Sequence, residues 1–164
     1  MADVTDEYYA SQAIVGYGGQ FKVGQGDSPE TMVAVPEINK ISGLVKLSTD
    51  VIEVTHLRSP NRHKEKRATM RDSAPISLEG NYRPDHGAHK VGGGDGFLAD
   101  HSLLDLSISG AQNNFQFEVT LADGTTKTLP LVGSVTGYEV GEVAVGGKVP
   151  FTLMITPLKD YFTN

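Results

Sequence analysis

The chain has 164 residues, 38% of them apolar and 21% charged, with a formal net charge of -6, which favours one globular domain with a single core. Because no apolar run approaches 18 residues and the acidic first residues lack the basic and apolar regions of a signal peptide, we expect neither a membrane span nor a secretory signal. Cysteine is absent, which excludes disulfides, thiolate metal sites and a cysteine nucleophile and fits folding in a reducing cytoplasm.

Positive charge is concentrated in one segment, residues 58–71. It holds six of the fourteen Lys and Arg residues and a single acid, so its net charge is +5 and the rest of the chain carries -11. An acidic body argues against general binding of nucleic acid, which needs a broad basic surface. A charge run of this kind is usually a solvated loop. Its basic residues are Arg58, Arg62, Lys64, Lys66, Arg67 and Arg71.

Short strands are predicted along most of the chain, and 19 glycines fit the turns between them. The weaker strand candidates, in chain order, are residues 13–23, 32–38, 51–57, 74–80 and 134–140. The strands at about 50–57 and 73–80 flank the basic segment. We therefore expect them to pair as one long hairpin with the basic segment at its tip.

The clearest strand signal is residues 113–121. Phe115 and Phe117 alternate there with polar residues, which is the period of two that a half-buried strand shows. Asp123 and Gly124 then suit a tight hairpin turn. Both phenylalanines are predicted to lie in the core.

Two further strands follow that turn. Residues 126–133 form the return strand, in which Pro130 indicates an edge position because proline cannot donate to a ladder. Residues 149–156 alternate again, and they place Phe151 and Leu153 on the apolar face. These two residues complete the predicted core.

One helix is predicted between these groups of strands. Asp95 can cap its start and Gly110 can end it, while Phe97, Leu104 and Ile108 fall on one apolar stripe. The predicted fold class is therefore mainly β: a β-sandwich or partly closed barrel with one flanking α-helix.

The motifs that could carry chemistry are weak. His86 and His89, with His101 further on, could ligate a metal, but glycines surround the first pair and no third ligand is placed by the pattern, so solvated loop histidines are the better explanation. The glycine-rich residues 92–96 occur once and lack the stacked copies of a calcium repeat. No catalytic motif or facing pair of carboxylates is present, so we expect neither an enzyme nor a metal or other cofactor.

The order of the segments is more informative than any one of them. Over roughly residues 14–157 it resembles the major tail tube protein of long-tailed, non-contractile bacteriophages and of related gene transfer agents. The most specific pieces are "VTHLRS" at 54–59 and "GNYRP" at 80–84. The other segments that carry the resemblance, in order, are "GYGGQFKVGQG", "VPEINKISGL", "ISLEGNYRPD", "FEVTLADGTT" and "GSVTGYEVGE".

The resemblance implies a structural protein that forms six-membered rings, stacked head to tail into a tube that carries DNA to the host. It implies no enzymatic activity and no cofactor. The implied partners are further copies of the chain, a tape-measure protein, tail terminator and distal tail proteins, an assembly chaperone and unbound DNA in the lumen, but no membrane. The implied location is the virion tail, assembled in the host bacterial cytoplasm.

In such a tube the chain is a single domain, residues 1–164, with arms at about 1–12 and 158–164. The loop corresponding to 58–71 reaches from one ring to the next in the resembling family, so its six basic residues are expected to contact acidic residues of the adjacent ring. Glu53, Glu79 and Glu139 are expected to face the lumen. Two alternatives stay open: the inner tube of a secretion or contractile injection system, and a monomeric β-sandwich binding module, for which the absence of Trp is unfavourable.

Overall fold

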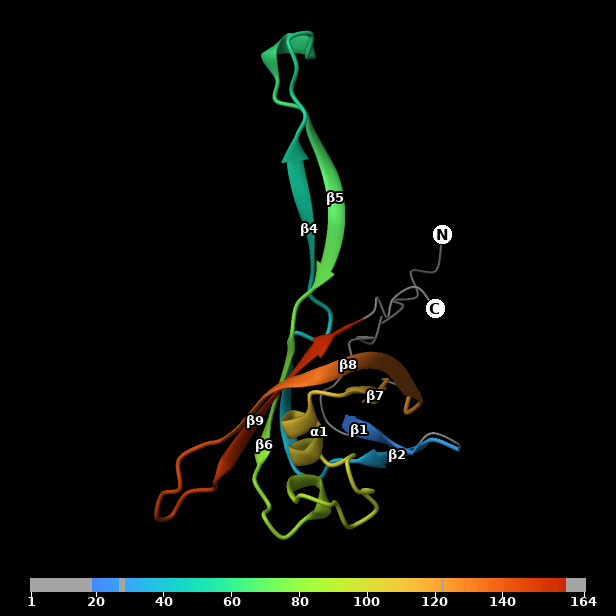
Figure 1. Ribbon diagram of the computed structural model, residues 1–164, viewed down its shortest axis with the longest axis vertical. Helices are drawn as coiled ribbons and strands as arrows, with labels where there is room; N and C mark the ends of the chain where they lie inside the picture. The colour runs from blue at the N-terminus through green and yellow to red at the C-terminus, as the bar shows by residue number, and fades with distance from the viewer. Residues whose placement is uncertain (1–18, 27–28, 122, 159–164) are drawn as a thin grey trace, which may run out of the picture.

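The computed structural model describes residues 19–26, 29–121 and 123–158, which form two antiparallel sheets (Figure 1). The larger has seven strands in the order β2-β1-β7-β8-β9-β6-β3, and the smaller is the hairpin of β4 and β5. The strands are β1 (Gln20–Gln25), β2 (Thr31–Ala34), β3 (Ile38–Ser42), β4 (Leu47–Glu53), β5 (Lys66–Ser73), β6 (Ile76–Asn81), β7 (Gln112–Thr120), β8 (Thr126–Val140) and β9 (Pro150–Pro157).

The seven-stranded sheet curls towards closure, because its two edge strands, β2 and β3, follow each other in the chain. The connection between them is held to both sides of the sheet. Val35 donates its backbone N–H to the carbonyl of Phe21 on β1 at 2.9 Å, and Asn81 on β6 donates to the carbonyl of Glu37 at 3.0 Å. The fold is a partly closed barrel, and the predicted mainly β class with one flanking helix is confirmed.

The core lies on the inner face of this sheet. Phe115 and Phe117 of β7 are 0% and 1% exposed, and Phe151 and Leu153 of β9 are fully buried, so all four predicted core residues are confirmed. Phe21 of β1 packs against Phe117 with ring centroids 5.1 Å apart. The period of two thus directs the apolar side chains of several strands into one core.

Residues 82–111 cover the inner face and contain the helices η2 (Gly87–His89) and α1 (Leu103–Ser109). Leu103 and Leu106 of α1 are buried in the core, and the helix contacts β8. Gly110 ends the helix as predicted: it is left-handed, with φ of 66°, and donates its N–H to the carbonyl of Leu106. Among the described residues no helix is long and apolar enough to cross a membrane.

The predicted start of the helix at Asp95 is wrong. Gly96 and Asp100 have φ values of 93° and 68°, which a right-handed helix cannot contain, and the N-cap is Ser102, whose hydroxyl accepts from the N–H of Asp105. The predicted stripe is wrong as well, since Ile108 is 71% exposed.

The glycine-rich run before the helix is tightly packed. Asp95 accepts a hydrogen bond from the N–H of Gly87 at 2.9 Å, and a Cβ atom at Gly87 would lie only 1.8 Å from the carbonyl oxygen of Gly94. The buried carboxylate of Asp105 accepts from the N–H of Gly92 at 3.0 Å. The run therefore joins η2 to α1 by close backbone contact.

The predicted pairing of strands around the basic segment is also wrong. β4 pairs with β5, from Leu47 opposite Ser73 to Glu53 opposite Lys66, while β6 pairs with β3 and β9 in the larger sheet. The reason is burial, because Ile76 of β6 belongs to the core whereas every residue of β4 is exposed.

Pro130 lies on β8, which is one continuous strand between β7 and β9 rather than an edge strand. Its ladder with β9 covers only Gly133 to Val140, so at the level of Pro130 the described partner of β8 is β7 alone. The edge prediction is wrong for the strand as a whole, although proline occupies the part of it that has one described neighbour.

Candidate functional surfaces

The outer face of the seven-stranded sheet is polar. Strand register places Glu79 of β6, Thr152 of β9 and Glu139 of β8 in one row across three neighbouring strands. The neighbours of Glu79 and Thr152 along their strands are buried, and Tyr138 beside Glu139 is partly buried against the core, so this row points away from the core. Other polar side chains of this face include Gln20, Lys22, Lys40, Ser77, Asn114, Gln116, Glu118, Thr128, Ser134 and Thr156.

On the outer face Lys22 forms a close, partly buried pair with a carboxylate, and Lys40 forms a weak, exposed one. Lys22 Nζ lies 2.7 Å from Glu118 Oε1, with both side chains at most 24% exposed, and Lys40 Nζ lies 3.9 Å from Glu79 Oε2. Amide and hydroxyl groups supply most of the rest of the face. The result is a surface that forms hydrogen bonds with water but carries little net charge.

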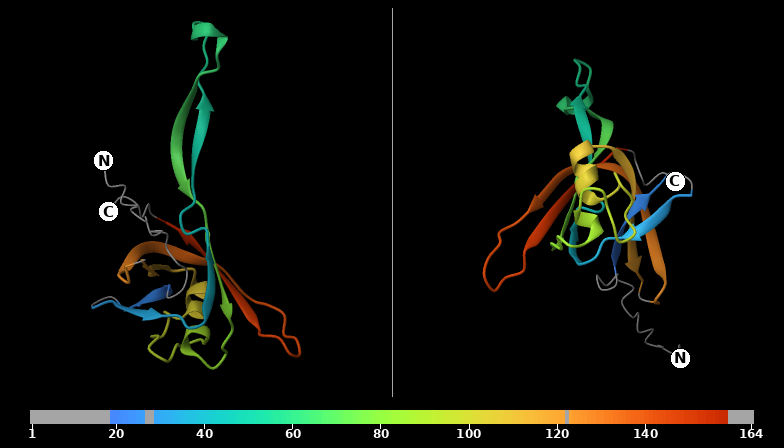
Figure 2. Two further views of the ribbon diagram at one scale, coloured as in Figure 1. Left: turned by 180° about the vertical axis from the view of Figure 1, so that it is seen from behind. Right: turned by 60° about the horizontal axis from the view of Figure 1, so that its bottom comes forward.

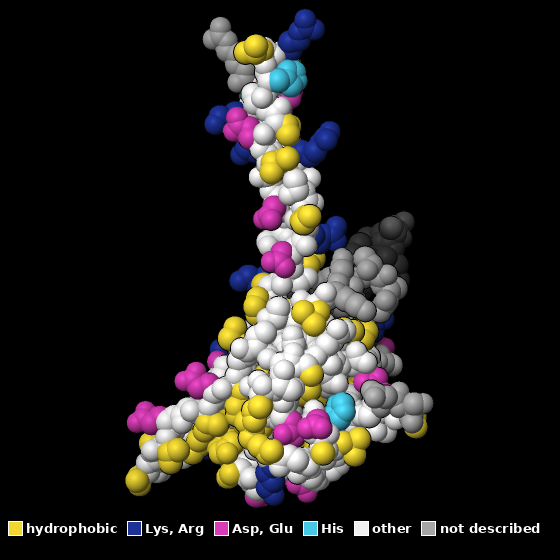
Figure 3. All heavy atoms as spheres, viewed as in Figure 1, with side chains coloured by type: hydrophobic (Ala, Val, Ile, Leu, Met, Phe, Trp, Pro, Cys, Tyr) yellow, Lys and Arg dark blue, Asp and Glu magenta, His cyan; other side chains and the backbone are white. Residues whose placement is uncertain are grey.

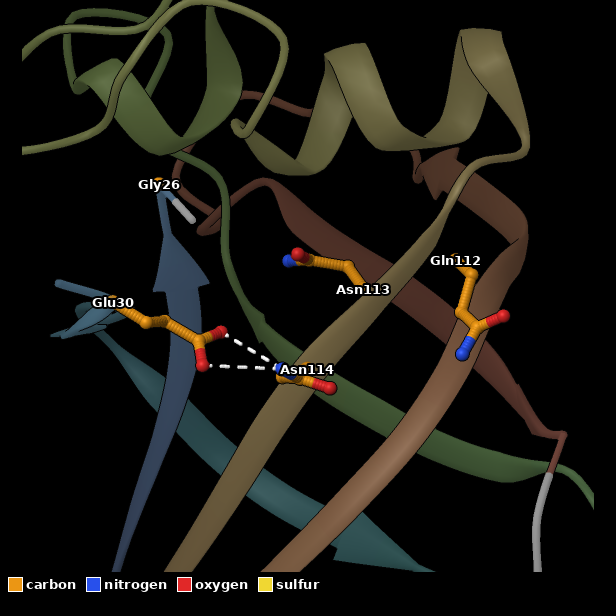
Figure 4. Close-up of a pocket in the computed structure, with 5 residues that line it drawn as sticks. All are labelled: Gly26, Glu30, Gln112, Asn113 and Asn114. Carbon is orange, nitrogen blue, oxygen red and sulfur yellow. Dashed lines mark hydrogen bonds between the residues drawn. The ribbon is translucent and has the colours of Figure 1, made fainter. Parts of the chain in front are cut away.

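A polar pocket of about 420 Å3 lies where β1 ends and β7 begins (Figure 4). The carboxylate of Glu30 accepts hydrogen bonds from Asn114 Nδ2 at 3.0 and 3.1 Å. Within the described lining Glu30 is the one acid, and its partner is an amide, so the pocket has no acid-base pair of the kind that hydrolysis uses. The described lining residues are Gly26, Glu30, Gln112, Asn113 and Asn114.

The hairpin of β4 and β5 projects from the body in all views (Figures 1 and 2). All residues of β4 are exposed, and those of β5 are exposed except Ser73, which is intermediate. A register shift between Thr49 and Val51 marks a bulge in the ladder. The short helix η1 (Pro60–Arg62) forms the tip, with Asn61 at φ of 54°.

Basic residues run along this hairpin (Figure 3). Lys64 Nζ lies 3.5 Å from Glu53 Oε2, but the two side chains are 73% and 48% exposed, so the contact is weak. Lys66 stands opposite Glu53 in the ladder, and Arg67 stands opposite Ile52. The side chains of Arg58, Lys64, Lys66 and Arg67 are exposed, so their positive charges are open to solvent.

Apolar side chains are exposed on the same hairpin. An isolated two-stranded hairpin is at best marginally stable in water, and clustered exposed apolar groups mark an interaction surface. Both observations mark the hairpin as a candidate interaction surface. The exposed apolar residues are Leu47, Val51, Ile52, Val54, Leu57 and Met70.

The predicted site residues divide between two places. Glu79 and Glu139 lie together on the outer sheet face, whereas Glu53 lies on the hairpin. Of the six basic residues, Lys66, Arg67 and Arg71 lie on β5, and Arg58, Arg62 and Lys64 lie in the tip that connects the two strands. The predicted arm at 1–12, and all of the predicted arm at 158–164 except Leu158, lie outside the described residues.

Sequence reasoning missed two features: the exposed apolar side chains of the hairpin, and the position of Thr152 between Glu79 and Glu139 on the outer face. In residues 47–54 apolar side chains fall on both faces of the strand, a pattern that differs from one-sided burial and could have indicated a strand outside the core. The position of Thr152 beside Glu79 and Glu139 follows only from the register of β9 against β6 and β8, which no single segment encodes.

The three histidines do not converge. His89 is 3% exposed and its Nδ1 lies 2.6 Å from the hydroxyl of Tyr138, while His86 Nδ1 accepts from the N–H of Ala88. Burial, followed by the nearby positive charges of His86 and Arg83, lowers the pKa of His89 to about 4. In the described part of the chain no group of three or more His, Cys, Asp or Glu side chains could hold a metal ion.

The fold is similar to solved structures of tail assemblies. A chain of the anti-feeding prophage baseplate superposes with a TM-score of 0.63 at 10% identity, covering 91% of this chain and 94% of that one. The SPP1 tail tube gives 0.59 at 10%, covering 90% and 77%. The tail of an empty gene transfer agent particle with C6 symmetry gives 0.56 at 16%, covering 90% and 96%.

No family model matches the chain, and no curated protein matches it in sequence. A chain of the sheath/tube terminator of an extracellular contractile injection system is similar as well, with a TM-score of 0.59 at 17% identity over 92% of this chain and 96% of that one. Phage, gene transfer agent and contractile injection-system structures are thus all among the similar folds. The chain has the tail tube-like fold that these phage, gene transfer agent and injection-system proteins share.

Proposed function

We propose that the chain is a structural subunit of a non-contractile tail tube, built from hexameric rings stacked head to tail, through which DNA passes to a host cell. The observation that carries the proposal is the combination of a tail tube-like fold with two uncovered surfaces: a polar sheet face and an exposed hairpin. A tube subunit needs both, because it must line a bore and contact the next ring.

The outer sheet face suits the bore. DNA carries one negative charge per about 1.7 Å of its axis, so a bore that lets it slide should lack unpaired positive charge. Lys22 and Lys40 on this face are paired with Glu118 and Glu79, and Glu139 adds a negative charge. We assign Glu79 and Glu139 to the lumen and leave Glu53 with the hairpin.

The hairpin suits contact between rings. The net charge of +5 on residues 58–71, which form its tip and part of β5, is opposite in sign to the -11 carried by the rest of the chain, and complementary charge directs head-to-tail association. Its exposed apolar residues, such as Ile52 and Met70, would be buried against the adjacent ring. In this proposal Arg58, Arg62, Lys64, Lys66, Arg67 and Arg71 contact acidic residues of that ring.

The role is structural and not enzymatic, and it assigns the chain to a virion tail assembled in the bacterial cytoplasm. Besides further copies of itself, the proposed partners are a tape-measure protein in the growing tube, an assembly chaperone, and terminator and distal tail proteins at the ends. DNA is a passenger that the subunit does not bind specifically.

Electron microscopy of the purified full chain at high concentration tests the proposal. We expect tubes with a central bore and six-fold top views. Addition of preformed tube ends as seeds covers the case in which assembly needs an initiator. A chain that stays monomeric with seeds, over the whole concentration range, would favour the monomeric binding module.

A contractile injection system is the second candidate. The TM-score of 0.63 with the anti-feeding prophage baseplate chain and the 17% identity with the sheath/tube terminator chain favour it. Imaging of the native particle separates the two, because an inner tube is surrounded by a sheath that shortens, whereas a non-contractile tube is the outer surface of the tail. A sheathed particle would replace the first candidate by the second.

A further inference from the structure

The connection between β8 and β9, residues 141–149, projects beyond the rest of the seven-stranded sheet (Figures 1 and 2). The ladder of β6 with β9 ends at Asn81 opposite Pro150, and the N–H of Gly141 closes the base of the projection by donating to the carbonyl of Pro150 at 2.7 Å. Val143 is 79% exposed and Val145 is fully exposed. We call this segment the β8–β9 tip, and it presents these two apolar side chains to solvent.

Helix α1 presents a second apolar surface. Leu104 is half-buried and Ile108, one turn further on, is 71% exposed, so the two lie side by side on the outer side of the helix. The exposed Val91 lies close by, because the hydroxyl of the N-cap Ser102 donates to the carbonyl of Lys90 at 2.7 Å and holds this segment against the start of the helix. We call Val91, Leu104 and Ile108 the α1 face.

Apolar side chains that gather in this way differ from single exposed ones, which are normal on a protein surface. In Figure 3 they cover the part of the body that carries α1 and continue along the β8–β9 hairpin. Both surfaces belong to the body and leave the β4–β5 hairpin free for the proposed contact between rings. A ring needs a contact of its own between neighbouring subunits, and these two surfaces are available for it.

The charges beside the two surfaces distinguish how two copies would meet. Glu142 precedes Val143 in the tip and Lys90 precedes Val91 on the α1 face, and both charged side chains are exposed. A tip placed on the α1 face of another copy brings these opposite charges together. Contact between two tips or between two α1 faces would instead bring like charges together, which complementary interfaces avoid.

We propose that the β8–β9 tip of one subunit packs on the α1 face of the next subunit in the same ring. Val145 is then buried against Ile108, and Glu142 lies beside Lys90. Because the two copies use different surfaces, the contact repeats from subunit to subunit until the ring closes. The inference rests on the proposed function in one respect, the assembly of this chain into rings.

Cross-linking between cysteine variants tests the contact, since the sequence has no cysteine of its own. Val145→Cys and Ile108→Cys, one of them carrying a tag, are mixed at concentrations at which the original chain associates and are treated with a short bifunctional maleimide. The control pairs Val145→Cys with Thr126→Cys, an exposed position at the start of β8. We expect mixed dimers at a yield at least about tenfold above the control, because thiols held side by side react as an intramolecular pair. Yields equal to the control, or dimers of like variants in place of mixed ones, would overturn the proposal.

Charge exchange in the same cross-linking pair tests the orientation. Glu142→Lys and Lys90→Glu should each lower the yield of mixed dimers about two- to fivefold, the size expected when one exposed ion pair is lost. The two substitutions together should restore the original yield. Lys127→Glu, at an exposed position of β8 outside both surfaces, should leave the yield unchanged. Failure of the combined exchange to restore cross-linking would overturn the pairing of tip and face.

Electron microscopy of the same samples separates this inference from the proposed function. Tubes without mixed cross-links would overturn the inference and leave the proposed function standing. Mixed cross-links in rings that never stack, even with seeds, would support the inference while the proposed tube failed. Monomers that form neither cross-links nor tubes would overturn both.

Discussion

Reversing three charges on the hairpin separates folding of the subunit from stacking of rings. The triple variant replaces Lys64, Lys66 and Arg67 with Glu. Within one subunit it removes the exposed pair between Lys64 and Glu53, which contributes about 0–1 kcal/mol. The substituted positions are exposed and lie outside the core, so we expect a thermal midpoint within about 4 °C of the original.

The effect on assembly should be larger. Three contacts with acids of the next ring at about 0–1 kcal/mol each amount to at most about 3 kcal/mol per subunit, or about 150-fold in affinity. Reversal also turns attraction into repulsion at every subunit of the ring. We therefore expect no tubes at concentrations that saturate growth of the original chain, as followed by light scattering and sedimentation.

The matched control keeps the charges and changes the side chains: Lys64→Arg, Lys66→Arg and Arg67→Lys. It should form tubes normally at low salt, and high salt should weaken both the control and the original chain because exposed pairs are screened. Normal growth of the reversed variant at low and high salt alike would refute the reasoning, and the tip would then be an ordinary solvated loop.

Three further predictions concern the core, the buried histidine and the bore. Phe117→Ala should cost about 3–5 kcal/mol of unfolding free energy in urea titrations, whereas Gln116→Ala on the outer face should cost less than about 1; equal losses would show that the faces are wrongly assigned. Burial lowers the pKa of His89 from 6.5 to about 4, so the folded protein resists protonation; the contribution of His89 to stability should be full above pH 6.5 and fall by at most about 3 kcal/mol towards pH 4. Thermal melts of the original chain and of His89→Gln should therefore show a stability difference that changes over this pH range, and a difference that is the same at every pH would show that His89 is not responsible. Glu79→Lys with Glu139→Lys should permit tube growth but slow DNA delivery, measured by gene transfer, and normal delivery would remove both residues from the lumen.

The core was predictable from the sequence because it depends on local alternation. In β7 and β9 one face is buried along the whole strand, so Phe115, Phe117, Phe151 and Leu153 identify that face without knowledge of the neighbouring strands. Gly110 was predictable for a similar reason, because a glycine after an apolar helical stretch is a local signal for the left-handed residue that ends a helix.

The features that failed depend on tertiary context. Asp95 has the chemistry of an N-cap, but the left-handed residues that follow it prevent a helix, and its carboxylate caps the N–H of Gly87 instead. The partner of β4 could not be chosen from its sequence, because a strand exposed on both faces has no one-sided pattern that fixes a register. Glu53 was grouped with Glu79 through that incorrect pairing.

The candidate surfaces were only half predictable. The charge of residues 58–71 and the acids at 79 and 139 are visible in the sequence, yet their grouping follows from strand order. Glu79 and Glu139 are 60 residues apart and share a row only because β9 pairs with both of their strands. The charged tip was recognisable, but the exposed apolar strands that carry it were not.

A helical reconstruction of the assembled tube tests the central claim most directly, because it locates both surfaces at once. The account predicts six subunits per ring, with the row of Glu79, Thr152 and Glu139 facing the bore and the β4–β5 hairpin lying against the next ring. A reconstruction in which that row faces outward, or in which the hairpin makes no contact with an adjacent ring, would contradict it.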